Sequence, residues 1–147
     1  MSSSLPKFGL FVALLVSGSF HALAFEGAVV IANPGVAADS LSTDKIEDIY
    51  TGGTKYWDDG QAIIIIVLPD KTDAALQQAS GMDANHFKTF WQRMVFSGHG
   101  RQPSKADDAA ALVALVASTK GAIALVPTNA VLKGVKIIEV KQITDHP

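Results

Sequence analysis

Short apolar runs alternate with amphipathic segments along the chain, and each pattern predicts a different element. Residues 28–32 (AVVIA) are apolar and rich in β-branched side chains, which predicts a strand, and Asn33-Pro34-Gly35 predicts the turn after it. Residues 62–68 and 122–126 are apolar at every position, as in strands that are buried on both faces. Residues 135–140 are more mixed, which predicts a strand at the edge of the sheet.

Four further segments have the hydrophobic spacing of helices. Their candidate N-caps are Ser42, Thr72, Asp83 and Ser104. The first helix, residues 42–51, is expected to bury Ile46, Ile49 and Tyr50, and the second covers residues 72–79. The third has the clearest apolar stripe, formed by Phe87, Phe90, Trp91, Met94 and Val95. The fourth would have two acidic residues in its first turn, Asp107 and Asp108.

The alternation of strands and helices predicts an α/β fold. We expect one domain with a mostly parallel sheet of four or five strands and helices on both faces. No repeat, linker or low-complexity segment divides residues 25–147, and their number, 123, suits one compact domain.

The N-terminal residues 1–24 have the order of a secretory signal peptide. Lys7 provides a positive start, residues 8–16 (FGLFVALLV) are apolar, and small residues precede the expected cleavage site after Ala24. The apolar run is shorter than the roughly 20 residues that span a bilayer. An apolar first helix or a membrane anchor is the alternative. We therefore expect a periplasmic domain of residues 25–147 without stable membrane insertion.

The composition of the chain excludes several classes of function. The chain has no cysteine, which excludes a thiol nucleophile, an iron–sulfur cluster and a cysteine-based zinc site. Removing Lys7 leaves 11 basic against 14 acidic residues in the domain, a net charge of −3. Nucleic-acid binding proteins usually carry a basic face, so this balance argues against a nucleic-acid partner.

Four stretches occur in a familiar order: LSTDKIEDIYTG with WDDG (residues 41–52 and 57–60), IVLPDKT (66–72), FWQRMVFSGHGRQP (90–103) and GAIALV (121–126). In these stretches the chain resembles the periplasmic phosphate-binding proteins of ABC transporters, as a single lobe of a type II periplasmic-binding-protein-like domain. The resemblance implies a solute-binding-like protein that captures phosphate or another small anion for uptake or sensing. It also implies a transporter or another envelope membrane protein as the partner.

In that family, a turn of the type Arg-x-x-Ser-Gly-Thr follows one strand and holds phosphate with its hydroxyls and N–H groups. The matching turn here is residues 68–73, and the resemblance points to Lys71 and Thr72 as ligand residues. The arginine is absent, and Asp70 and Asp73 stand beside the helix N-terminus. Because these carboxylates repel an anion and compete for the same N–H donors, tight phosphate binding is not expected at this turn.

The loop of residues 97–101 (SGHGR) is a second candidate anion site. Its glycines free the backbone to present N–H groups beside Ser97 and Gly98, and Arg101 offers a bidentate guanidinium. The alternative is a surface loop whose glycines only allow the turn before Pro103.

Other candidate residues have simpler interpretations. Tyr56 and Trp57 form either an aromatic wall of a site or, as we favour for Trp57, a plug at the end of the core. Asp83 and His86 could ligate a metal, but helix capping explains Asp83 without one. No GxSxG or HExxH motif occurs, so we expect no enzyme, cofactor or metal. The alternative function is a periplasmic protein-interaction module that has kept the fold and lost ligand binding.

Overall fold

A computed structural model describes residues 25–142, so the predicted signal peptide, residues 1–24, and the last residues, 143–147, lie outside the described range. The strands in this range are β1 (Ala28–Ala32), β2 (Ser40–Ser42), β3 (Ile64–Val67), β4 (Ser104–Lys105), β5 (Ala122–Pro127) and β6 (Lys136–Lys141). The helices are α1 (Thr43–Tyr50), α2 (Asp73–Ser80), α3 (Ala84–Phe96) and α4 (Ala109–Ser118). None of these helices is long and apolar enough to cross a membrane.

The described strands form one mixed sheet in the order β2-β6-β1-β5-β3-β4. Strand β3 pairs in parallel with β4 and β5, β2 pairs in parallel with β6, and β1 runs antiparallel to both of its neighbours. The predicted α/β fold with a mostly parallel sheet is confirmed, although the sheet has six strands where four or five were expected. The two short strands β2 and β4 were not predicted, because neither contains the apolar run that marks a strand in sequence.

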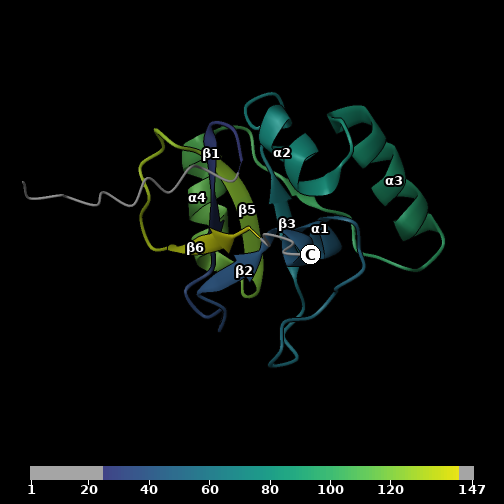
Figure 1. Cartoon of the computed structure of the whole chain (residues 1–147), viewed down its shortest axis with the longest axis horizontal. Helices are drawn as coiled ribbons and strands as arrows, with labels where there is room; N and C mark the ends of the chain where they lie inside the picture. The colour runs from purple at the N-terminus through teal and green to yellow at the C-terminus, as the bar shows by residue number, and fades with distance from the viewer. Residues whose placement is uncertain (1–24, 143–147) are drawn as a thin grey trace, which may run out of the picture.

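Helices cover both faces of the sheet, as predicted (Figure 1). Helices α1, α2 and α3 pack on one face over a core that includes Ile65 of β3. Helix α4 packs on the other face over a second core that includes the next residue, Ile66. Successive side chains of a strand point to opposite faces, so the uninterrupted apolar run of β3 is explained by burial on both faces.

The prediction that residues 135–140 form an edge strand is wrong. Strand β6 lies between β2 and β1, and the edge on this side is β2. Ile138 is buried, whereas its neighbours Ile137 and Glu139 are exposed. The mixed pattern therefore reflects one strand face that is open to solvent, and it does not indicate a missing neighbour.

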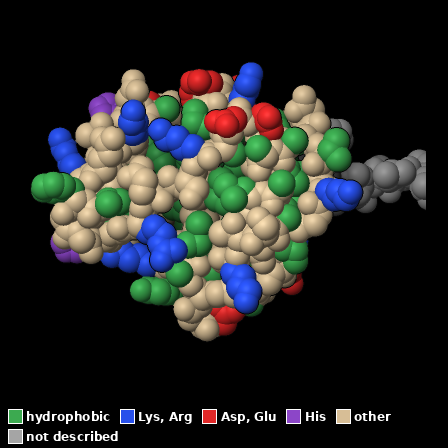
Figure 2. Space-filling model, turned by 180° about the vertical axis from the view of Figure 1, so that it is seen from behind, with side chains coloured by type: hydrophobic (Ala, Val, Ile, Leu, Met, Phe, Trp, Pro, Cys, Tyr) green, Lys and Arg blue, Asp and Glu red, His purple; other side chains and the backbone are tan. Residues whose placement is uncertain are grey.

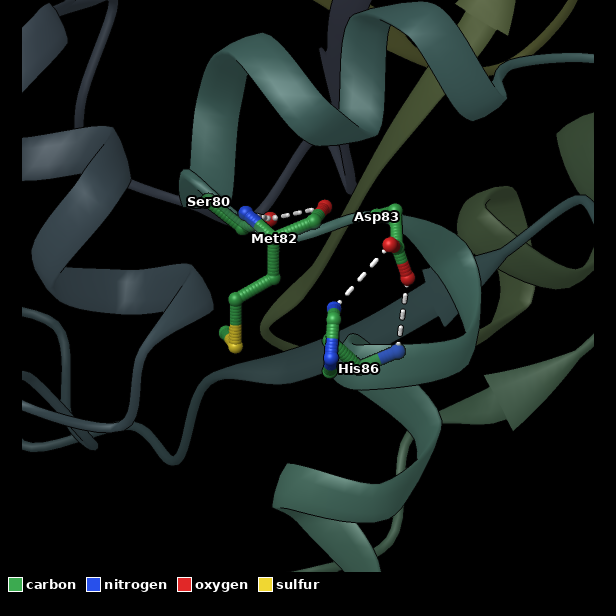
Figure 3. Close-up of polar contacts among 4 residues, drawn as sticks. All are labelled: Ser80, Met82, Asp83 and His86. Carbon is green, nitrogen blue, oxygen red and sulfur yellow. Dashed lines mark hydrogen bonds and ion pairs between the residues drawn. The ribbon is translucent and has the colours of Figure 1, made fainter.

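Three of the predicted helix starts are observed. The Ser42 hydroxyl accepts a hydrogen bond from the Lys45 N–H at 3.1 Å, and Thr72 is the N-cap residue of α2. The Asp83 carboxylate accepts the His86 N–H at 2.8 Å, and its other oxygen lies 3.0 Å from His86 Nδ1 (Figure 3). The Asp83–His86 pair thus acts as a helix cap. Residues 25–142 contain no group of three His, Asp or Glu side chains that could hold a metal ion.

The predicted N-cap of the last helix, Ser104, is wrong. Ser104 and Lys105 pair with β3 as the edge strand β4. The helix begins only at Ala109, and its N-cap is Asp108, whose carboxylate accepts the Ala111 N–H at 2.7 Å. Pairing with β3 keeps Ser104 in an extended conformation and moves the helix start four residues along the chain.

Candidate functional site

Two pockets lie on either side of Trp91. The first, which we call the Arg101 pocket, has a cavity volume of about 300 Å³ and is bounded by the start of β3 and the loop after α3. The second, the Tyr50 pocket, has a volume of about 240 Å³ and is bounded by the end of β3 and by residues of α2 and α3. Trp91 and Gln102 line both pockets, so they form the boundary between the two.

The Arg101 pocket is lined by basic and apolar side chains. Lys55, His99 and Arg101 are its basic residues, and no aspartate or glutamate lines it. All three basic side chains are exposed, as is Tyr56, which has 62% of its surface open to solvent. On the face shown in Figure 2, most acidic side chains lie along the upper edge, where a basic side chain stands beside them, and most other Lys and Arg side chains lie below this edge. The pocket therefore has the charge to attract a small anion.

Lys55 reaches this pocket because the segment before β3 folds back on itself. Tyr56 and Ala62 form an isolated antiparallel bridge, and the Ile63 N–H donates to the Lys55 carbonyl at 2.9 Å. Trp57 anchors the turn, since its side chain is buried and its indole N–H donates to the Gly121 carbonyl at 3.0 Å. Trp57 thus plugs the core, as favoured from the sequence, while Tyr56 lines the pocket wall.

The first three N–H groups of the SGHGR loop are not free, as the sequence suggested they could be, whereas those of Gly100 and Arg101 make no hydrogen bond to another described residue. The N–H groups of Ser97, Gly98 and His99 donate to carbonyls of the last turn of α3 at 3.0, 3.0 and 2.8 Å. The Ser97 hydroxyl donates to the Met94 carbonyl at 3.2 Å and lies 2.9 Å from His99 Nδ1. The carboxyl end of a helix is the negative end of its dipole. An anion in this pocket would therefore be held mainly by side-chain charge, with only the Gly100 and Arg101 N–H groups left to donate from the loop backbone.

The turn after β3 is closed by its own side chains. The Asp73 carboxylate accepts the Asp70 N–H at 3.1 Å, and the hydroxyl of the buried Thr72 donates to the Leu68 carbonyl at 3.2 Å. Asp70 has a positive φ of 69°, in the left-handed region that asparagine and aspartate tolerate better than most residues. Asp73 thus occupies one of the N–H donors of the turn, as the sequence suggested for these carboxylates, and the Thr72 hydroxyl is bound within the turn.

The predicted site residues are not brought together at one place. Gly98 and Arg101 line the Arg101 pocket, and Thr72 lines the Tyr50 pocket. Lys71 and Ser97 line neither of these two pockets. The sequence interpretation missed Lys55 and His99 as pocket residues. Lys55 follows a helix end in the sequence, and only the bridge between Tyr56 and Ala62 carries it to the loop after α3.

No protein-family model and no curated protein sequence matches the chain. Its fold, however, is similar to that of solved phosphate-binding proteins. One, from Clostridium perfringens, was assigned as a phosphate ABC transporter substrate-binding protein and solved with bound phosphate. Its TM-score is 0.59 at 20% identity, over 78% of this chain and 44% of that chain.

An ABC-type phosphate transport receptor from Vibrio cholerae gives a TM-score of 0.52 at 17% identity, over 84% of this chain and 48% of that one. PstS from Borrelia burgdorferi gives 0.54 at 11% identity, over 82% and 49%. The chain thus has the fold of one lobe of these proteins and spans less than half of their length. At these identities the likeness is one of fold.

Proposed function

We propose that residues 1–24 are a signal peptide, that residues 25–147 form an exported solute-binding-like domain, and that its Arg101 pocket binds a small anion such as phosphate in the periplasm. The observation that carries the proposal is the charge of this pocket: Lys55, His99 and Arg101 line it without an aspartate or glutamate. The fold likeness supports the same class of function, since the solved proteins are named as phosphate-binding or phosphate-transport proteins.

Side-chain charge alone predicts weak and salt-sensitive binding. The Arg101 guanidinium can make two parallel hydrogen bonds to a phosphate or carboxylate, whereas Lys55 contributes a single mobile charge. Both side chains are exposed, so dissolved salt screens them within about 8–10 Å. Three of the five loop N–H groups are already bound to α3. We therefore expect a Kd on the order of 1 mM at low ionic strength.

The N-terminus of α2 is the competing location for the anion, because the side chain of its N-cap residue makes no capping hydrogen bond. Asp70 and Asp73 lie beside it, and Asp73 already accepts the Asp70 N–H. The two carboxylates at this helix end oppose a phosphate, and the lysines that line the same pocket, Lys88 and Lys105, only balance them, so this place has no net positive charge. Charge therefore favours the Arg101 pocket over the turn after β3.

Isothermal titration of the purified protein with phosphate, sulfate and acetate at low salt tests the proposal. Arg101→Ala combined with Lys55→Ala should weaken phosphate binding at least about tenfold. Lys133→Ala, at an exposed lysine that lines neither pocket, is the matched control and should leave binding unchanged. If Lys71→Ala weakens binding and Arg101→Ala does not, the anion binds at α2 and the proposed location is wrong. No heat with any of the three anions at millimolar concentration would overturn anion binding altogether and favour the interaction-module alternative.

A further inference from the structure

The Tyr50 pocket lies at the carboxyl end of β3, the edge at which open α/β sheets usually bind ligands. Its walls are mainly apolar and come from the core: Leu68, Leu76, Phe87, Trp91 and Leu125. Its volume of about 240 Å³ is below that of sites for drug-sized ligands, so only a small molecule fits. An inorganic anion would leave these apolar walls without a partner.

One polar group among these walls has no partner in the described part of the chain. Tyr50 lines the pocket with its side chain 1% exposed, and its hydroxyl makes no hydrogen bond to any described residue. Burial raises the pKa of Tyr50 well above its usual value, so the hydroxyl stays protonated and able to donate. A buried hydroxyl without a partner is costly, and a ligand with an acceptor atom removes that cost.

The remaining lining residues bring charges of both signs. Two are acidic, Asp70 in the turn before α2 and Asp73 in α2 itself. Two are basic, Lys88 of α3 and Lys105 of β4, so the four charges sum to zero. None of these four side chains forms an ion pair with another described residue. A ligand with a single charge would be attracted by two of them and repelled by the other two. A zwitterion whose ammonium group lies near the aspartates and whose carboxylate lies near the lysines is attracted by all four.

We propose that the Tyr50 pocket binds a small zwitterion with an apolar body, of which the apolar α-amino acids are the simplest members. The ligand's ammonium group faces Asp70 and Asp73, and its carboxylate faces Lys88 and Lys105. The apolar side chain of the ligand packs on the apolar walls. The Tyr50 hydroxyl donates to an acceptor atom on this buried part of the ligand. This site is separate from the Arg101 pocket and does not depend on anion binding there.

The test titrates the purified protein with L-methionine, L-methionine sulfoxide, glycine and inorganic phosphate. Both methionine compounds should bind. Glycine has the same two charges but no side chain, so it should bind at least roughly tenfold more weakly. The sulfoxide adds one strong acceptor to the same side chain. Tyr50→Phe should therefore weaken sulfoxide binding roughly fivefold and leave methionine within about twofold.

Two controls separate binding from folding. Tyr50→Phe removes an unpartnered hydroxyl and keeps the ring, so the thermal midpoint of the ligand-free variant should stay equal or rise. Lys88→Gln should weaken both methionine compounds, whereas Lys133→Gln, at an exposed lysine outside both pockets, should not.

Four results would each overturn the proposal. The first is no binding by either methionine compound, and the second is equal sulfoxide affinity in the wild type and Tyr50→Phe. The third is a crystal structure soaked with L-methionine sulfoxide in which only a water molecule contacts the Tyr50 hydroxyl. Displacement of methionine by phosphate would also contradict it, because it would make the Tyr50 pocket an anion site.

Discussion

Replacing Gly121 by alanine should lower the free energy of unfolding by more than the cost of its backbone conformation alone. Gly121 connects α4 to β5 with a φ of +78°, a left-handed conformation that side chains other than glycine rarely adopt. A Cβ atom built on it would lie 2.0 Å from the carbonyl oxygen of Ala62, and 3.2 Å from its carbonyl carbon. The nearest obstacle is backbone and not a mobile side chain, so the alanine can fit only if one of the two segments moves.

The size of the loss follows from what this movement breaks. The left-handed conformation costs a non-glycine residue about 1–2 kcal/mol. The Gly121 carbonyl also accepts the indole N–H of Trp57 and the backbone N–H of Ile64, both at 3.0 Å, and each bond contributes about 1 kcal/mol. We therefore expect Gly121→Ala to lower the free energy of unfolding by on the order of 3–4 kcal/mol.

Urea denaturation of Gly121→Ala beside Gly134→Ala measures the contribution of the close contact. Gly134 has nearly the same φ, +74°, but its added Cβ would meet only the Cβ of Ala117 at 3.4 Å, an ordinary contact. Gly134→Ala should therefore lose only the conformational part, about 1–2 kcal/mol. Equal losses in the two variants would refute the reasoning, because the contact with Ala62 would then cost nothing.

Two further predictions concern side chains that close helix ends. Asn33→Ala should lower the free energy of unfolding, measured by urea denaturation, by about 2–3 kcal/mol. The buried Asn33 amide donates to the Val116 and Ala117 carbonyls at 3.0 Å and accepts the Gly35 N–H at 2.9 Å, and alanine loses these bonds. Asn33→Asp should lose at least as much, since a carboxylate cannot donate to those carbonyls, and a smaller loss than in the alanine variant would contradict this. Asp83→Ala should lower the thermal midpoint at neutral pH, because hydrogen bonds from the His86 backbone and interaction with its ring hold the pKa of Asp83 below its usual value. That stabilisation is present above the unfolded-state pKa of about 3.9 and is lost as the pH falls through the lower folded-state pKa, so the difference between the two proteins should shrink in acid. A difference that stays constant down to low pH would show that the charge of Asp83 is not involved.

Local patterns were enough to predict the elements that carry their own signal. Strand β1 begins and ends where its apolar run does, and α1 follows the capping residue Ser42. The apolar runs of β3 and β5 also indicated burial on both faces correctly. In each case the residues that decide the structure lie within one short segment, so no knowledge of a distant partner was needed.

Features that depend on distant partners could not be predicted in this way. Ser104 is a good capping residue in isolation, but pairing with β3 makes it part of a strand. The stripe of α3 predicted five buried side chains, whereas Phe87 and Trp91 are buried and Val95 is 39% exposed. The helix extends beyond the core that it covers, and the sequence does not reveal where that core ends.

The candidate sites combine both kinds of feature. Arg101 and its glycine loop were visible as a motif, but the use of three of the loop N–H groups by the end of α3 was not. Lys55 and Tyr50 carry no motif at all. Lys55 enters its pocket through the turn anchored by Trp57, and the unpartnered hydroxyl of Tyr50 is known only once the packing around it is known.

The fold and the charges of this chain point to different ligands at different places. The fold is that of one lobe of phosphate-binding proteins, and in open α/β sheets the usual ligand position is the carboxyl end of the strands. Here that position carries Asp70 and Asp73, which disfavour a phosphate, together with the apolar walls and hydroxyl of the Tyr50 pocket. The lysines of that pocket, Lys88 and Lys105, only balance these aspartates, whereas the basic side chains on the other side of Trp91, around Arg101, share their pocket with no aspartate or glutamate. Because a fold hosts many ligands and the residues of the site select among them, the charges and not the fold should decide what each pocket binds.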